Sequence, residues 1–150
     1  MRFLPIICLF LTPTGAIASA QPSTQHRASL TRAQMREAEQ KLFDLGYWTG
    51  AIDGIFDPAT RSALIAFQKW EGRPITGRLT LDELEEIRNS TSPKAREPGY
   101  AHVEIDIDRQ VLLMVNDDGG VRVLPISSGN DQPFIDEGQT SKAYTPRGRF

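Results

Sequence analysis

The spacing of apolar residues changes at about residue 100 of this chain. Before that point apolar side chains recur every three or four residues, a period typical of amphipathic helices. From His102 to Asp108 they alternate with polar residues, a period typical of a strand with one buried face. The pattern predicts an α + β chain in separate domains: a small three-helix bundle followed by an incomplete antiparallel β domain.

Capping residues mark the predicted starts of three helices within residues 31–88, and the first helix is predicted to begin at Ser29 or Thr31. Thr31 and Thr80 are each followed three residues later by Gln or Glu, the spacing of a capping box. Asp57 offers a side-chain oxygen to free helix N–H groups, and Pro58 suits the first helical turn because it lacks an N–H. The apolar residues expected to pack the helices together are Met35, Ala38, Leu42, Leu45, Ala63, Leu64, Phe67, Trp70, Ile75, Leu81, Leu84 and Ile87.

Glycine-centred turns separate the first two predicted helices. Gly46 follows the last apolar residue of the first helix, where glycine adopts a left-handed conformation without steric cost. Thr49-Gly50 and Asp53-Gly54 are favoured turn dipeptides. The chain is therefore expected to leave one helix, turn twice and enter the next.

These helices and turns resemble the small three-helix peptidoglycan-binding domain. The positions that match its pattern are Leu45, Gly46, Tyr47, Gly50, Asp53, Gly54, Phe56, Thr60, Ala63, Leu64, Phe67 and Gln68. The resemblance covers residues 31–88 and implies binding to the glycan strand or stem peptide of peptidoglycan. Two positions depart from the family pattern: Asp57 replaces a usual glycine, and Glu39 replaces a usual glutamine and adds charge near the expected groove.

Four residues of this segment are candidates for ligand binding: Tyr47, Trp48, Asp53 and Arg61. Neighbouring residues of an extended segment point in opposite directions. Either one of Tyr47 and Trp48 is buried while the other stacks on a sugar, or both close over the helices. Asp53 either fixes its own turn or contacts ligand. Arg61 either pairs with a stem-peptide carboxylate or stays solvated.

The second half is predicted to hold a short antiparallel sheet. The predicted order is a linker over residues 89–100, strands over 102–108, 110–116 and 121–126, and an irregular polar loop over 130–144. In the first strand Val103, Ile105 and Ile107 share a face that is expected to be buried. So few strands leave an apolar face and a sheet edge exposed unless more chain covers them.

Two motifs follow the third predicted strand. The first is Ile126-Ser127-Ser128-Gly129, and the second is a TPRGRF run over residues 145–150, in which Thr145, Pro146 and Gly148 fit a TPxGxF signature. Residues 101–150 thus resemble the start of an L,D-transpeptidase (YkuD-like) catalytic domain. That resemblance implies acyl transfer between peptidoglycan stem peptides through a cysteine thioester, with no metal or cofactor.

The nucleophile of that family has no counterpart in this sequence. The family carries a cysteine in a serine-histidine-glycine-cysteine run downstream of TPxGxF, whereas the only cysteine here is Cys8. His102 matches no catalytic position of the family. We therefore predict no catalytic residue, expect the chain as given to be inactive, and interpret it as the N-terminal portion of a longer enzyme or as a truncated product.

Residues 1–20 have the organisation of a secretory signal peptide. A basic residue precedes an apolar run over residues 3–11, and residues 18–20 read Ala-Ser-Ala, a cleavage site. The run is too short to span a bilayer, and isoleucine before Cys8 disfavours a lipid anchor there. A flexible leader over residues 21–30 follows. The prediction is a secreted protein of the periplasm or cell wall that is not an integral membrane protein.

Charge and composition narrow the function classes. A net charge of −2 gives no electrostatic basis for nucleic-acid binding. The preferred function is an exported peptidoglycan-binding protein that forms the N-terminal portion of an L,D-transpeptidase. The alternative is a non-catalytic peptidoglycan-binding protein. A zinc-dependent wall hydrolase is disfavoured because the second half lacks paired histidines with an acidic partner.

Overall fold

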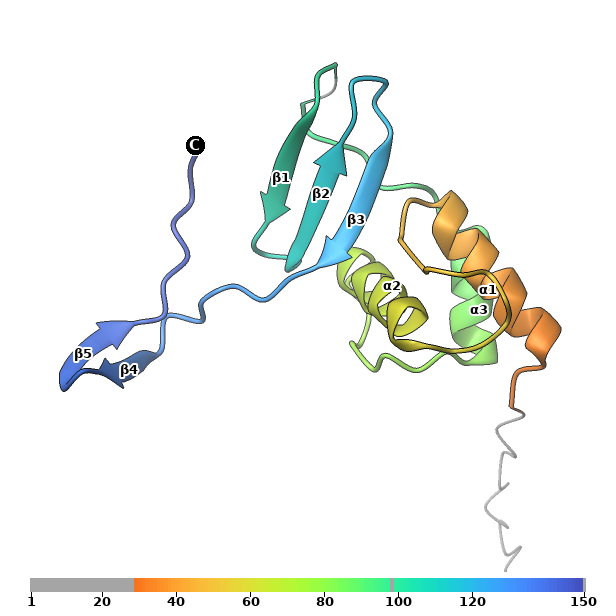
Figure 1. Cartoon of the computed structure of the whole chain (residues 1–150), viewed down its shortest axis with the longest axis horizontal. Coiled ribbons are helices and arrows are strands. Elements are labelled where there is room, and N and C mark those ends of the chain that lie inside the picture. Colours follow the sequence, from red (N-terminus) through yellow and green to blue (C-terminus); the bar gives the residue numbers. More distant parts are fainter. Residues whose placement is uncertain (1–28, 98, 150) are drawn as a thin grey trace, which may run out of the picture.

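A computed structural model describes residues 29–97 and 99–149 of the chain (Figure 1). The elements in order are α1 (Arg32–Asp44), α2 (Pro58–Trp70), α3 (Leu81–Asn89), β1 (His102–Asp106), β2 (Val111–Val115), β3 (Val121–Pro125), β4 (Pro133–Asp136) and β5 (Gln139–Lys142). Helices followed by antiparallel strands confirm the predicted α + β class. The predicted signal peptide, and most of the predicted leader, lie outside the described residues.

The helices begin at the predicted capping residues. The Gln34 N–H donates to the Thr31 hydroxyl at 3.3 Å, and the Gln34 side chain accepts from the Thr31 N–H at 2.9 Å. The capping box of α1 is therefore complete. Asp57 accepts a bond from the Thr60 N–H at 2.7 Å, and Thr80 caps α3 in the same way at 3.1 Å.

Two apolar residues predicted in the helical core are exposed instead. Leu81, the first residue of α3, is 43% exposed, and Ile75 is 59% exposed. The loop that contains Ile75 is held by polar bonds rather than by an apolar anchor. The Gln68 side chain accepts from the Gly77 N–H at 2.9 Å and donates to the Thr76 hydroxyl at 3.0 Å. Buried amide contacts of this kind leave no signal in an apolar pattern, so the prediction for Ile75 was wrong.

The first three strands form an antiparallel sheet in the order β1-β2-β3, and one face of this sheet covers α2 (Figure 1). On β2, alternate residues Val111, Leu113 and Val115 are at most 3% exposed. They belong to one hydrophobic cluster with Leu64 and Phe67 of α2. The helical and β halves thus share a core, and the boundaries of the proposed domains stay a prediction.

Strand β1 buries the face opposite to the predicted one. Val103 and Ile105 are 55% and 53% exposed, whereas Asp106 is only 8% exposed. The inward face of β1 is polar because the preceding segment binds it. Both the Arg96 N–H and the Glu97 N–H donate to the Glu104 carboxylate, at 2.8 Å and 3.0 Å. The apolar face of β1 is consequently left outside, uncovered by the part of the chain described.

The predicted linker and the predicted irregular loop also differ from expectation. Within residues 89–100, Pro93 is buried and Ala95 packs against the hydrophobic cluster, so this segment adheres to the fold. Residues 130–144 contain a hairpin, β4–β5, which lies away from the sheet and helices (Figure 1). Every residue of both strands is exposed, so no alternation of apolar and polar residues signals them.

Backbone bonds join the helical half to the sheet. The Val123 N–H donates to the Gly46 carbonyl at 2.9 Å, and Tyr47 pairs with Val123 in a parallel bridge. The segment after α1 therefore meets the outer edge of β3 at this single bridge. This contact covers part of a sheet edge that would otherwise be open.

The C-terminal end of α2 makes a second junction with the sheet. The Lys69 ammonium donates to the carbonyls of Gln110, at 3.3 Å, and Ile126, the residues that flank β2 and β3. Burial lowers the pKa of Lys69. The Arg109 guanidinium lies 4.8 Å from the centre of the Trp70 ring, a cation–π distance. Two separate junctions, one after α1 and one at the end of α2, therefore fix the sheet against the helical half.

Candidate functional site

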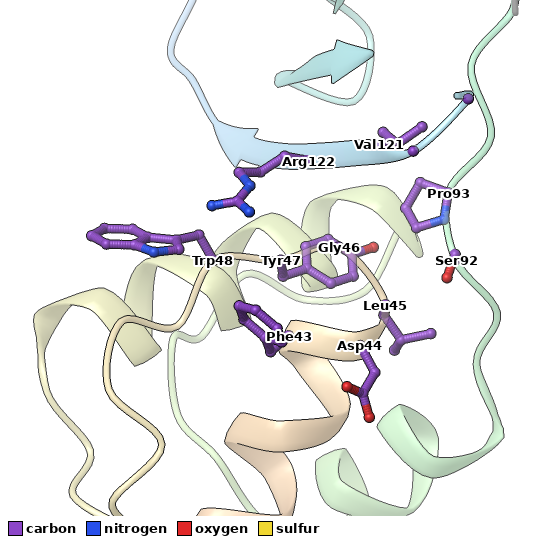
Figure 2. A pocket seen from close by; sticks show the side chains of 12 residues that line it. Phe43, Asp44, Leu45, Gly46, Tyr47, Trp48, Ser92, Pro93, Val121 and Arg122 are labelled. Carbon is purple, nitrogen blue, oxygen red and sulfur yellow. The ribbon is translucent and has the colours of Figure 1, made fainter. Parts of the chain in front are cut away.

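A pocket of about 340 Å³ opens where the helices meet the sheet (Figure 2). Its walls come from residues 43–48 at the end of α1, from Ser92 and Pro93, and from residues 119–122 at the start of β3. Pockets of this size are large enough for a small ligand. The pocket exists because the segment after α1 pairs with β3, so neither half could form it alone.

The two consecutive aromatic residues point in different directions at this pocket. Tyr47 is 1% exposed and packs edge-on against Phe67, with ring centres 5.8 Å apart. Burial, followed by the charge of Glu71, raises the pKa of the Tyr47 phenol. Trp48 is 48% exposed and lines the pocket. Of the two arrangements considered from the sequence, the structure has one ring buried and one exposed.

The other two ligand candidates lie outside the pocket. The Asp53 carboxylate accepts from the Ile55 N–H at 2.9 Å, which fixes its own turn, and its carbonyl accepts from Arg32 at 3.0 Å. Arg61 is exposed on α2, next to Gly77. The four candidates therefore do not converge on one place, and a binding role for each stays a prediction.

Glu39, which the sequence placed near a groove, is fully buried. Its carboxylate accepts from the Gly54 N–H at 2.8 Å and from the Thr60 hydroxyl at 3.4 Å. These bonds tie α1 to the second turn and to the start of α2. The family-pattern residue Thr60 and this carboxylate therefore stabilise the fold rather than contact a ligand.

The remaining family-pattern positions of the helical half are also structural. Gln68 is buried and holds the loop after α2, as described above, and its amide also donates to Glu83 at 3.2 Å. Phe67 belongs to the hydrophobic cluster and Phe56 packs against it. The glycines of the pattern, Gly46, Gly50 and Gly54, all have positive φ.

The two motifs of the β half lie next to each other. The Gly129 N–H donates to the Thr145 hydroxyl at 2.7 Å, so the Ser-Ser-Gly turn contacts the TPRGRF run. Pro146 and Gly148 are exposed. Beyond them, Arg149 pairs with Glu97 at 3.0 Å. The β4–β5 hairpin connects the two motifs, where the sequence predicted an irregular loop.

Phe43 and Arg122 are two of the pocket residues that were not among the sequence candidates. Phe43 is 43% exposed and Arg122 is exposed at the start of β3. Both belong to regular elements in which a single exposed position carries no distinctive pattern. Only the pairing of Tyr47 with Val123 brings them to one pocket.

The described residues were also searched for metal and membrane sites. Within residues 29–97 and 99–149, no three His, Cys, Asp or Glu side chains gather closely enough to bind a metal ion. In the same ranges, none of the helices has the length and apolarity needed to cross a bilayer.

The pocket itself combines exposed aromatic rings with a guanidinium, groups that suit a sugar or an acidic peptide.

Residues 31–87 match the family described as putative peptidoglycan binding domain. This part of the chain is therefore a domain of that class, as its sequence indicated. The match covers α1, α2, the turns that carry Trp48 and α3 as far as Ile87, and it ends before the sheet.

Among solved structures, the chain is similar to an L,D-transpeptidase (residues 123–326) from Xylanimonas cellulosilytica DSM 15894. The two share 37% sequence identity with a TM-score of 0.70, over 77% of this chain and 56% of that one. Both resemblances stated from the sequence are thereby confirmed.

Two curated relatives, each a localization factor PodJL from a strain of Caulobacter vibrioides, are 32% identical over 74 residues. The match covers 49% of this chain but 7% of those relatives.

Proposed function

We propose that this chain is exported to the cell wall, binds peptidoglycan and forms the N-terminal portion of an L,D-transpeptidase. The complete enzyme would cross-link stem peptides by cysteine acyl transfer. The observation that supports this most strongly is the extent of the likeness to the solved transpeptidase. At 77% of the chain it reaches well beyond the helical domain and into the sheet.

The described residues supply binding rather than chemistry in this proposal. Acyl transfer needs an activated nucleophile, a base within hydrogen-bond reach and donors for the oxyanion. His102 is the one histidine of the described part, and both its ring nitrogens are engaged, with the Tyr100 carbonyl at 2.8 Å and Glu104 at 3.0 Å. Its role is therefore structural, and the helical domain and pocket serve to hold peptidoglycan.

Retention by purified sacculi tests the binding part of the proposal. The full chain should sediment with sacculi and be released by soluble muropeptides. A folded chain that stays in the supernatant would contradict peptidoglycan binding, and circular dichroism of the same sample establishes folding.

The coding sequence beyond Phe150 tests the transferase part. A serine-histidine-glycine-cysteine run in frame predicts that the extended protein forms cross-linked muropeptide dimers, and that a cysteine-to-serine variant does not. An extended protein with that run and no acyl transfer to any stem peptide would contradict the proposal.

A non-catalytic peptidoglycan-binding protein is the second candidate. The observation that favours it is the 74-residue match to proteins described as localization factors. A stop codon directly after Phe150, together with sacculus binding, would favour this candidate over the transferase.

A further inference from the structure

The pairing of the segment after α1 with β3 decides which residues face the pocket. Tyr47 and Val123 are partners in the bridge, and both point into the core, at 1% and 0% exposure. Successive side chains of extended segments alternate between faces. Trp48 and Arg122, the neighbours of these two residues, are consequently on the opposite, solvent-facing side. Figure 2 shows the Arg122 guanidinium directed toward Trp48.

The pocket presents two exposed aromatic rings from the helical domain. Trp48 is 48% exposed and Phe43 is 43% exposed, and both line the pocket. Leaving large rings in water at one place is unfavourable unless they contact a partner. Flat apolar rings of this type match the apolar face of a pyranose sugar and the methyl of an N-acetyl group.

Arg122 is an exposed cation at the same pocket. Other exposed arginines of the β half have carboxylate partners: Arg147 pairs with Asp108 and Arg149 with Glu97. Among the described residues Arg122 makes no ion pair and no side-chain hydrogen bond. Its guanidinium is thus available to take a carboxylate in a bidentate pair.

The remaining walls allow a peptide to approach. Gly119 and Gly120 line the pocket without side chains, and a Cβ on Gly119 would meet no atom within 4 Å. Asp44, the other charged residue at the pocket, lies on α1 away from Arg122 (Figure 2) and accepts from Gln40 at 2.8 Å. Its charge disfavours a carboxylate at that end and favours one beside Arg122.

We infer that this pocket binds a muropeptide, with an N-acetylated sugar stacked on Trp48 and a stem-peptide carboxylate paired with Arg122. The inference rests on the proposed peptidoglycan binding and adds to it a residue from the sheet. Recognition is then shared: the helical domain binds the sugar, and β3 binds the peptide.

Binding of two soluble ligands to the full chain separates the two contributions. One ligand is a disaccharide tetrapeptide muropeptide, and the other is a peptide-free oligomer of N-acetylglucosamine, each titrated by calorimetry. Trp48→Ala should weaken the binding of both ligands about tenfold, the loss of a stacking contact. Arg122→Gln should weaken the binding of the muropeptide about tenfold and leave the affinity for the peptide-free oligomer unchanged, since only a charge-assisted pair is lost.

Matched variants elsewhere on the surface serve as controls. Tyr144→Ala removes an aromatic side chain that is 64% exposed, and Arg78→Gln removes an exposed arginine, both outside the pocket. Neither should change the affinity for either ligand, and all four variants should unfold at the wild-type urea midpoint. Controls that weaken binding as much as the pocket variants would overturn the inference.

Sacculus retention distinguishes this inference from the proposed function. If wild-type protein is not retained, peptidoglycan binding itself fails. If wild type is retained and Trp48→Ala and Arg122→Gln are retained equally, binding stands and the pocket is not its site. If Arg122→Gln weakens the binding of both soluble ligands equally, the assignment of sugar binding to Trp48 and of peptide binding to Arg122 is wrong.

Discussion

Replacing Gly46 by alanine tests the junction between the helical domain and the sheet. Gly46 has a φ of +100°, and a Cβ there would lie 2.4 Å from the Val121 carbonyl oxygen. The left-handed backbone costs a non-glycine residue about 1 to 2 kcal/mol. The clash also separates the Gly46 carbonyl from the Val123 N–H, a bond worth about 1 kcal/mol. We therefore expect urea denaturation to show a loss of about 3 kcal/mol in the free energy of unfolding.

Gly72→Ala is the matched control for this variant. Gly72 also has a positive φ, +64°, but a Cβ there would meet no atom within 4 Å. Gly72→Ala should lower the free energy of unfolding only through the left-handed backbone, by about 1 kcal/mol. Native-state hydrogen exchange should show the Val123 amide losing more protection in Gly46→Ala than the global change explains. Equal destabilisation by both variants, or an unaltered Val123 amide, would refute the reasoning.

Three further predictions follow from buried or engaged polar groups. Tyr47→Phe should raise the free energy of unfolding by about 1 kcal/mol, because the Tyr47 hydroxyl is buried without a partner among the described residues; a lower urea midpoint would contradict this. Lys69→Met should lower that free energy by about 1 to 2 kcal/mol by removing two charge-assisted bonds to strand-end carbonyls; an unchanged midpoint would show that the junction does not depend on them. Hydrogen bonds from His102, first to the Tyr100 carbonyl and then to Glu104, raise the pKa of the His102 ring. Its stabilising contribution is then complete below the unfolded pKa of about 6.5 and is lost as pH rises through the folded pKa. His102→Gln should thus reduce the difference in urea midpoint between about pH 5 and about pH 8, and NMR titration of the ring measures the raised pKa directly.

The parts of the fold that local chemistry determines could be predicted from the sequence. Thr31, Asp57 and Thr80 cap helices because their side chains bond an N–H two or three residues ahead, whatever lies around them. Strands β2 and β3 were found because they are apolar runs bounded by turn residues, above all Asp117-Asp118-Gly119-Gly120 between them. The family pattern of the helical domain was recognised for the same reason, since most of its positions fix turns and caps.

The parts that depend on distant contacts could not be predicted. An alternating pattern shows that Val103 and Ile105 share a face, but not which face the sheet turns toward α2. In the structure the inward face of β1 is the one that carries Glu104, which residues 96 and 97 bind, and bonds of this kind have no local signature. Arg122 was missed as a binding candidate for the same reason, because its neighbour across the pocket is 74 residues earlier in the chain.

The contacts between helices and sheet bear on how the protein would use bound peptidoglycan. A flexible tether between a binding domain and a second domain raises local concentration but leaves orientation free. Here the segment after α1 is paired with β3, and Lys69 and Trp70 of α2 contact the other end of the sheet. Motion of the helical domain relative to the sheet would break both junctions and expose the shared core. A glycan held at Trp48 would therefore keep a constant position relative to β3, because the segment that carries Trp48 is paired with that strand.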